Sequence, residues 1–258
     1  MRQMFGLGNT HMKTRCSLLL FILVALLITV GCAHNKTIDG FDANEWFEMG
    51  RQAGIDNQLD KALDAFNKAI ELDPKVAKTY INRGNAYDRL GNYKQAIADY
   101  DKVIELNPID SDIYINRGRS YYYLGNYNQT IEDYNKVIEL DTKDSEVYVS
   151  RGNAYDRLGN YKQAIVDYDK AIELNPKNIH AYVNRGGAYV KLSNHNQAIA
   201  DYDKAIELNA EFALAYYNRG FAYSAFGNHN QAIADWKIAA SLGLKEAQDY
   251  LKQQGIVW

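Results

Sequence analysis

The chain contains little cysteine and little proline. The first shortage excludes a disulfide-rich fold, and the second indicates where helices end. Of 258 residues only Cys16 and Cys32 are cysteines, so residues 33–258 cannot form a disulfide framework. The three prolines, Pro74, Pro108 and Pro176, are separated by 34 and 68 residues, which are one and two lengths of the same interval. Proline is tolerated where a helix stops, so this spacing predicts three helix ends.

Catalytic and metal-binding motifs are also missing from the sequence. It has no HExxH, no nucleophile elbow, no glycine-rich phosphate loop and no paired-cysteine motif. His195 and His229 replace tyrosines found at the same place in other repeats, but no third histidine or fixed carboxylate accompanies them. We therefore expect no enzyme activity, no cofactor and no metal site.

Acidic residues are absent from the first 32 positions, which contain three basic residues and the apolar run Leu18–Val30. A run of 13 residues is too short to cross a hydrocarbon core of about 30 Å, but it suits a secretory signal. We expect a signal peptide over residues 1–31. Met12 begins a more typical signal sequence and is a candidate start.

The signal ends in Thr29-Val30-Gly31-Cys32, which resembles the bacterial lipobox, although Thr29 replaces the usual Leu. The resemblance implies a lipidated Cys32, a tether over residues 32–42 and a lipid anchor in the cell envelope. Ala33 in place of Asp resembles lipoproteins of the outer membrane in two-membrane bacteria, with the soluble part periplasmic or at the surface. The alternative is an ordinary secretory signal cut near Gly31.

Without the leader, the net charge moves from −3 to about −6. Phosphate binding requires a basic surface, so we expect no nucleic-acid partner.

What the sequence does contain is a 34-residue period over residues 43–246. The six frames are 43–76, 77–110, 111–144, 145–178, 179–212 and 213–246. Each frame has an aromatic residue at position 4, Gly at position 8, Ala or Thr at position 20 and an aromatic residue at position 24. Such small and large residues at helical spacing predict closely packed helical hairpins. Glycines expected to end the first helix of a hairpin are Gly91, Gly125, Gly159 and Gly227.

This pattern resembles the tetratricopeptide repeat, a helix-turn-helix unit of the same period. The resemblance implies an all-α, right-handed superhelical solenoid of six repeats. Because a terminal repeat needs a polar-faced cap, residues 247–258 are expected to form a capping helix and tail.

Position 7 carries Arg in repeats two to six, and position 23 carries Asp in the same repeats. Repeat one has Met49 and Ala65 instead, so both charges are lost together. This predicts ion pairs such as Arg83 with Asp99, within a hairpin or between neighbours.

In this family the first helix of each repeat builds the inner face, which implies a groove for an extended peptide or a partner helix. Position 5 is apolar in all six repeats, and charges of both signs surround it. The expected groove residues are Phe47, Arg51, Ile81, Asn85, Arg89, Ile115, Arg119, Tyr122, Tyr123, Val149, Asn153, Arg157, Lys191, Tyr217 and Phe221. We place the centre at Arg119, Tyr122 and Tyr123, since Tyr and Arg are frequent binding hot spots.

The groove lacks the lysines and arginine by which related repeats hold chaperone tails, so we do not expect that ligand. The function expected is a membrane-anchored adaptor for a protein partner in envelope assembly or regulation. An alternative is an envelope receptor that binds a glycan or small ligand through its tyrosines. Stacking of solenoid ends is compatible with a homodimer.

Overall fold

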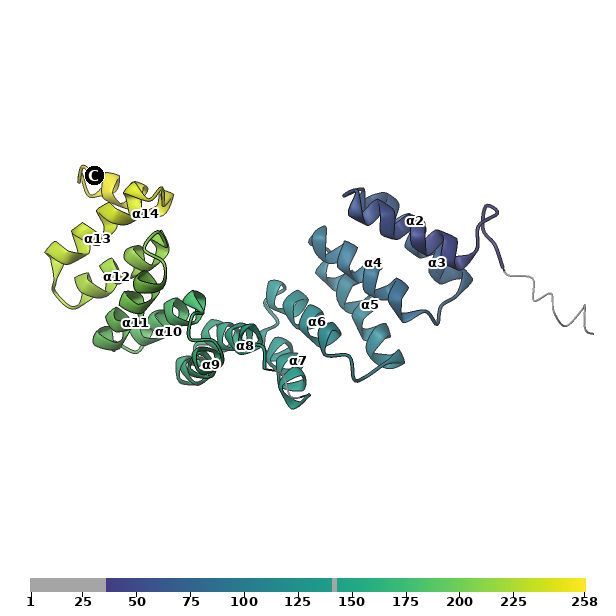
Figure 1. Ribbon diagram of the computed structural model, residues 1–258, viewed down its shortest axis with the longest axis horizontal. Helices are drawn as coiled ribbons and strands as arrows, with labels where there is room; N and C mark the ends of the chain where they lie inside the picture. The colour runs from purple at the N-terminus through teal and green to yellow at the C-terminus, as the bar shows by residue number, and fades with distance from the viewer. Residues whose placement is uncertain (1–35, 141–142) are drawn as a thin grey trace, which may run out of the picture.

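In a computed structural model, residues 36–140 and 143–258 are described, and they form thirteen α-helices without a sheet. The helices follow one another as antiparallel pairs and end in a single helix (Figure 1). Their bounds are α2 Ala43–Ile55, α3 Leu59–Leu72, α4 Ala77–Arg89, α5 Tyr93–Leu106, α6 Ser111–Tyr123, α7 Tyr127–Glu139, α8 Ser145–Arg157, α9 Tyr161–Leu174, α10 Ile179–Lys191, α11 His195–Leu208, α12 Ala213–Ala225, α13 His229–Ser241 and α14 Lys245–Gln253.

The turn between the two helices of a pair requires a left-handed backbone. Gly91 and Gly159 have φ values of 75° and 77°, so these glycines end their helices as predicted. Asn57 and Ser193 occupy the same place in repeats one and five, with φ values of 60° and 61°. Only glycine takes this conformation without steric cost, so these two turns are less favourable than the others.

Within each pair, the glycine at position 8 lets an aromatic ring from the second helix lie against the first helix. A Cβ atom on Gly84 would lie 2.8 Å from Cε1 of Tyr100, and one on Gly152 would lie 2.7 Å from Cε1 of Tyr168. Both rings are almost completely buried. The small and large residues that define the period therefore meet across the hairpin.

The core continues from each pair into the next. For example, Tyr168 of repeat four packs in one cluster with Ala181 and Ala188 of repeat five. Tyr202 of repeat five packs in another cluster with Ala215 of repeat six. Each repeat is thus buried by its neighbours, which confirms a tetratricopeptide-type solenoid.

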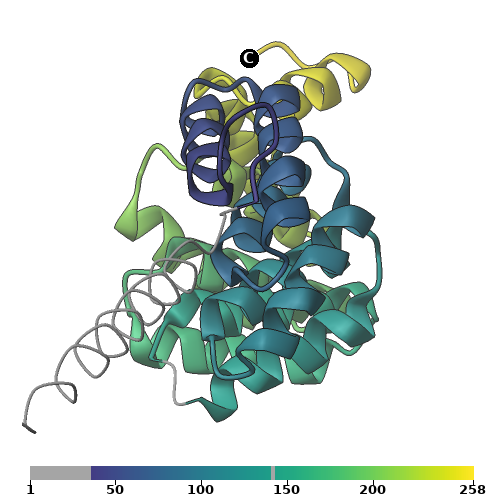
Figure 2. The same cartoon turned by 90° about the vertical axis from the view of Figure 1, so that its right-hand side faces the viewer.

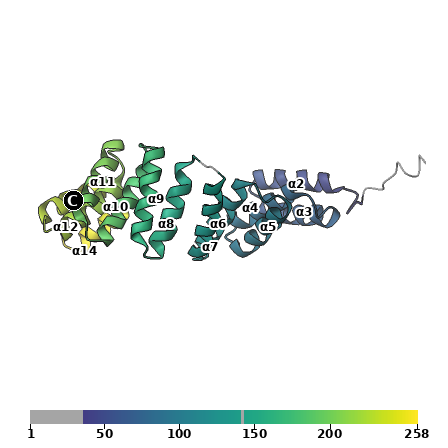
Figure 3. The ribbon, with the colours of Figure 1, turned by 90° about the horizontal axis from the view of Figure 1, so that it is seen from below.

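The pairs are stacked side by side along a curved array (Figure 3). The first and last pairs both rise above the middle repeats in two perpendicular views (Figures 1 and 2). The first helices lie on the inner side of this curve, and contacts join α2 to α4, α4 to α6, α8 to α10 and α10 to α12. α6 and α8 approach each other less closely, so successive first helices are spaced more widely at the junction of repeats three and four.

Both ends of the array are covered by short segments. Residues 36–41 form a turn against α2, where Trp46 Nε1 donates to the carbonyl of Ile38 at 3.0 Å and the Trp46 ring contacts Phe41. The second half of the expected tether is therefore folded. At the other end, α14 buries Ala247 and Leu251 against α13 and leaves its charged residues in water.

Candidate functional site

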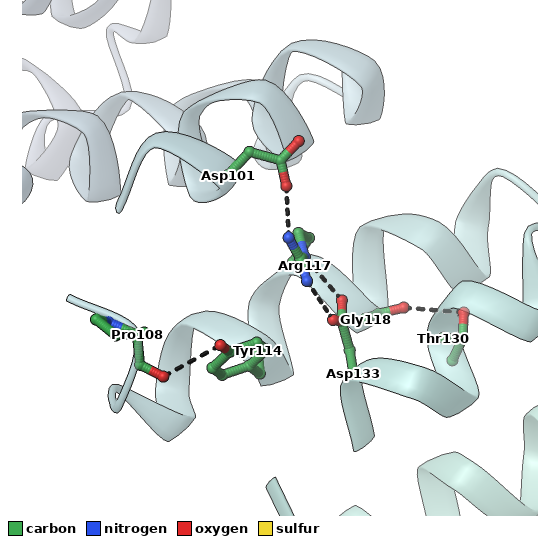
Figure 4. A network of polar contacts seen from close by, with 7 residues as sticks. All are labelled: Asp101, Pro108, Tyr114, Arg117, Gly118, Thr130 and Asp133. Atoms are coloured by element: carbon green, nitrogen blue, oxygen red, sulfur yellow. Dashed lines mark hydrogen bonds and ion pairs between the residues drawn. The ribbon is translucent and has the colours of Figure 1, made fainter. Parts of the chain in front are cut away.

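Five arginines on the first helices form a ladder of ion pairs, and Figure 4 shows the contacts of one of them, Arg117. In repeat three, Arg117 donates from Nε and Nη2 to Asp133 at 3.0 and 2.5 Å, and from Nη1 to Asp101 of the preceding repeat. The same bidentate contact joins Arg83 to Asp99, Arg151 to Asp167, Arg185 to Asp201 and Arg219 to Asp235. The predicted pairing of positions 7 and 23 is thus confirmed.

The sequence prediction missed the third contact of each arginine. Nη1 always donates to position 25 of the preceding repeat. That position carries Asn or Asp in repeats one to five but Lys237 in repeat six, after which no arginine follows. The change from Asn or Asp to Lys237 at the last repeat could have predicted this third contact from the sequence. The ladder therefore joins helices within pairs and pairs to each other.

The ladder carboxylates are deeply buried. Burial raises the pKa of Asp99, Asp133 and Asp201, while the hydrogen bonds from their arginines oppose that rise. Charges taken out of water in this way need their partners, because an unpaired buried charge is costly. We conclude that these arginines are structural and are not available to a ligand.

A second set of cations lies on the inner face and is held by neutral groups. Arg89 donates to the carbonyl of Gly54 at 2.8 Å and to Oδ1 of Asn57 at 2.9 Å. Arg157 donates from Nε to the hydroxyl of Tyr122 at 3.1 Å. Lys191 makes no hydrogen bond or ion pair with any residue in the described ranges. None of these three exposed cations forms an ion pair within the described residues, although the Asp156 carboxylate lies near Arg157 and Lys191.

Two other inner-face cations, Arg51 and Arg119, are partly neutralised. Arg51 pairs with Glu48 on its own helix at 2.7 Å. Arg119 pairs with Asp88 of the preceding repeat at 3.3 Å, and Asp88 also accepts from the buried hydroxyl of Ser120 at 2.6 Å. Cations without an ion pair in the described residues therefore stand at position 13 of repeats two, four and five, and also at Lys78, which bonds to the neutral Asn44 at 3.4 Å.

Three hollows follow one another along the inner face. The first has a volume of about 410 Å³, and the predicted residues Arg51, Asn85 and Arg89 line it. The second, of about 190 Å³, lies at the junction of repeats three and four; it is lined by Arg119, Tyr122, Tyr123, Tyr134, Ser150 and Asn153.

The third hollow, of about 320 Å³, is lined by Tyr122, Asn153, Asp156, Arg157, Tyr168, Val183, Asn184, Gly187, Lys191, Leu214 and Asn218. It shares Tyr122 and Asn153 with the second hollow, so the two are adjacent.

Tyrosine rings gather at the predicted centre. Tyr123 is 60% exposed and stacks on Tyr93 of the preceding repeat, with ring centroids 5.1 Å apart. Tyr122 meets both Tyr123 and Tyr127 edge to face. Because Tyr122 also accepts from Arg157, this cluster links the inner faces of repeats two, three and four.

The apolar residues at position 5 lie deeper than the sequence suggested. Phe47 and Val149 are buried in the core, at 6% and 4% exposure, and so do not present a surface to a ligand. Three others, Ile81, Ile115 and Tyr217, are half-buried, and each packs against the core cluster of its own repeat. Phe47 packs against Ala62, Phe66 and Ala69 of α3, the second helix of its own pair. Val149 packs in a cluster with residues of α9 and α10.

Repeat six offers the exposed apolar end of the inner face. Phe221 is 37% exposed and contacts Tyr217, Trp236 and Tyr250 through ring edges. Leu214 is 42% exposed and lines the third hollow. The inner face thus changes from charged in the early repeats to apolar at the last one.

Sequence reasoning missed Gly187 as a determinant of the inner face. It occupies position 9, where the other repeats carry Arg51, Asn85, Arg119, Asn153 and Phe221. The absence of a side chain at this one position 9 could have predicted a hollow in the inner face from the sequence.

Cys32, the predicted lipidation site, lies outside the described residues. The two histidines noted in the sequence were not expected to form a metal site. His229 is exposed, and His195 has a buried Nδ1 without a hydrogen-bond partner. Residues 36–140 and 143–258 contain no group of three or more metal-ligating side chains, and no helix among them is long and apolar enough to span a bilayer.

Models of known families match most of the repeat region. Two models described as "Tetratricopeptide repeat" and one described as "TPR repeat" together cover residues 56–227 without a gap. Their matches are residues 77–110 and 145–178, residues 99–132 and 167–200, and residues 56–91, 118–159 and 188–227.

Solved structures are similar to this chain over most of their length. The crystal structure of MamA protein is 30% identical, with a TM-score of 0.60 over 67% of this chain and 94% of MamA. YrrB, described as a TPR protein with an unusual peptide-binding site, is 24% identical, with a TM-score of 0.59 over 74% of this chain and 99% of YrrB.

Among curated proteins, the Protein SGT1 homolog of Oryza sativa subsp. japonica is 33% identical over 57 residues. That match covers 22% of this chain and only 16% of the rice protein. The period, the packing of glycine against aromatic rings and the family models all lead to one conclusion: the chain belongs to the tetratricopeptide repeat family.

Proposed function

We propose that this protein is a non-enzymatic adaptor that binds a protein partner on the inner face of its solenoid. The observation that carries the proposal is the row of three hollows lined by exposed cations, tyrosines and amides. Such a surface offers both donors and acceptors to a peptide backbone and charges to its side chains. YrrB, which has the same fold, has a peptide-binding site, so the architecture is suited to this role.

The adaptor works at a membrane in this proposal, through lipid on Cys32 in the bacterial cell envelope. The basic start, the short apolar run and the Thr29–Cys32 sequence support export and lipidation. More than one acyl chain is needed for a stable anchor. Metabolic labelling with an alkyne fatty acid tests this, because a Cys32→Ala variant should lose both the label and its place in the membrane fraction. Labelling that persists in the variant would rule out Cys32 as the acceptor.

Partner binding is tested by crosslinking in intact host cells. The variant replaces Arg119, Tyr122 and Tyr123 by alanine, and the control replaces Lys102, Lys136 and Lys170, whose salt bridges lie on second helices. We expect an envelope protein that copurifies with the wild type and with the control, but not with the groove variant. An identical set of proteins from all three would place the binding site elsewhere.

A second candidate function is an envelope receptor for a glycan. The exposed ring of Tyr123, within a cluster of four tyrosines, favours it because sugars stack on such rings. A rise in melting temperature with a specific oligosaccharide, lost in Tyr123→Ala, would support this candidate over the adaptor.

A further inference from the structure

Gly187 of α10 is a glycine that packing does not require. A Cβ atom there would meet only the hydroxyl of Tyr202, at 4.0 Å, whereas a Cβ atom on the adjacent Gly186 would lie 2.8 Å from the same ring. A glycine inside a helix also costs stability relative to other residues. The absence of a side chain at Gly187 therefore has no structural cause among its neighbours, and its effect is to open the third hollow.

The hollow at Gly187 is apolar on one side and amide-lined on the other. Leu214 is 42% exposed beside it, and Val183 forms part of its floor. Asn153 accepts from Asn184 Nδ2 and from the Tyr168 hydroxyl, both at 2.8 Å, so its orientation is set by two bonds. The wall is thus built by repeats four, five and six together.

Two cations stand at the rim. Arg157 is fixed by its bond to Tyr122, and Lys191 lies at the same position in the following repeat, without a partner in the described part of the chain. Asp156 lies beside them in the same hollow, where burial raises its pKa and the two cations oppose that rise. Two cations and one carboxylate leave an excess of positive charge in a chain that is acidic as a whole.

We propose that the hollow at Gly187 receives one large apolar side chain of an acidic peptide segment, whose flanking carboxylates bind Arg157 and Lys191. This inference rests on the proposed adaptor function and states the chemistry of its partner. A peptide fits better than a polyphosphate, since Asp156 and the amide oxygens accept hydrogen bonds that a phosphate backbone cannot donate. The apolar side chain would cover Leu214 and exclude water from the two ion pairs.

Selection from a phage library of random peptides tests this on the purified full-length protein in detergent. We expect the enriched peptides to carry net negative charge and one large apolar residue with Asp or Glu near it. In Gly187→Phe the added ring fills the hollow. Gly187→Asn introduces the residue that repeats two and four carry at the same position, Asn85 and Asn153. Both variants should weaken an enriched peptide roughly tenfold or more in fluorescence anisotropy. Their melting temperatures should stay equal to that of the wild type or rise.

A control variant, Val166→Phe, adds a ring to a side chain that is 66% exposed on the second helix of repeat four, and it should bind like the wild type. Replacing Arg157 and Lys191 by Glu should turn the selection toward basic peptides. Neutral or basic peptides on the wild type, or equal binding by Gly187→Phe, would overturn this inference and leave the adaptor intact. A library that enriches nothing would also refute it, whereas the adaptor is judged separately by crosslinking.

Discussion

Removing one arginine from the ladder should expose the cost of a buried carboxylate. Arg83 is a suitable choice because its bonds go to one acid, Asp99, and to the neutral Asn67. The Asp99 side chain is only 5% exposed and that of Arg83 19%. Breaking such a pair from one side costs about 3 to 5 kcal/mol. We expect Arg83→Met to lose about 3 kcal/mol, near the lower limit, because water can reach Asp99 along the path that Arg83 leaves.

Repeat one supplies the matched control, because it has Met49 and Ala65 at these two positions. Asp99→Ala should cost about 1 to 2 kcal/mol, since Arg83 keeps Asn67 and some contact with water. The double variant Arg83→Met/Asp99→Ala should lie within about 1 kcal/mol of the wild type, because no buried charge remains. The coupling energy of the pair is then about 3 to 6 kcal/mol.

Urea unfolding followed by circular dichroism measures the free energy of unfolding of the wild type, the two single variants and the double variant. The data are fitted with a nearest-neighbour model for the array. The pH dependence provides a second measurement. In Arg83→Met the folded-state pKa of Asp99 lies above its unfolded value of about 3.9, so stability is lost as pH rises through this range. The double variant should lack this loss. Equal stability of Arg83→Met and wild type, or a double variant as weak as the single one, would refute the reasoning.

Three further predictions follow from local geometry. Ser193→Gly should raise stability by about 1 kcal/mol, because it relieves a left-handed backbone at φ 61°; an unchanged urea midpoint would contradict this. Gly84→Ala should cost about 1 to 3 kcal/mol, since its Cβ would press on the buried ring of Tyr100, while Gly54→Ala, which meets no neighbour within 4 Å, should cost nothing. Burial raises the pKa of Tyr100 and Tyr202, so each side chain should ionise only on unfolding. Each should therefore lower the free energy of unfolding by about 1.4 kcal/mol per pH unit above pH 10. Phenolate absorbance that reaches its full value while the helices persist would rule out this last prediction.

The period made the helical pairs predictable from sequence. A glycine and an aromatic residue at fixed offsets, such as Gly84 and Tyr100, encode a contact within one hairpin, and the paired loss at Met49 and Ala65 revealed the ladder. The folded turn at residues 36–41 was not predictable, because its contacts with Trp46 and Lys68 have no counterpart in the repeat.

The inner face was harder to predict, because it depends on how closely neighbouring repeats approach. Helical geometry predicted Phe47 and Val149 as groove residues, but both are buried in core clusters with residues of the second helices α3 and α9. The exposed residues Arg89, Arg157 and Tyr123 were recognised because long polar or aromatic side chains reach beyond these clusters. Gly187 was overlooked because the absence of a side chain is a weaker signal than a motif.

Repeats two and four separate what one repeat encodes from what its neighbour supplies. The stretches 83–97 and 151–165 are identical, and their glycine and tyrosine pack in the same way in both. Their inner-face arginines nevertheless have different partners, since Arg89 bonds to a backbone carbonyl and an asparagine, and Arg157 bonds to Tyr122. The acceptors belong to the preceding repeat in each case. Ligand selectivity must therefore come from the repeats that were not copied, so replacing repeat three by a copy of repeat two should alter binding more than exchanging repeats two and four.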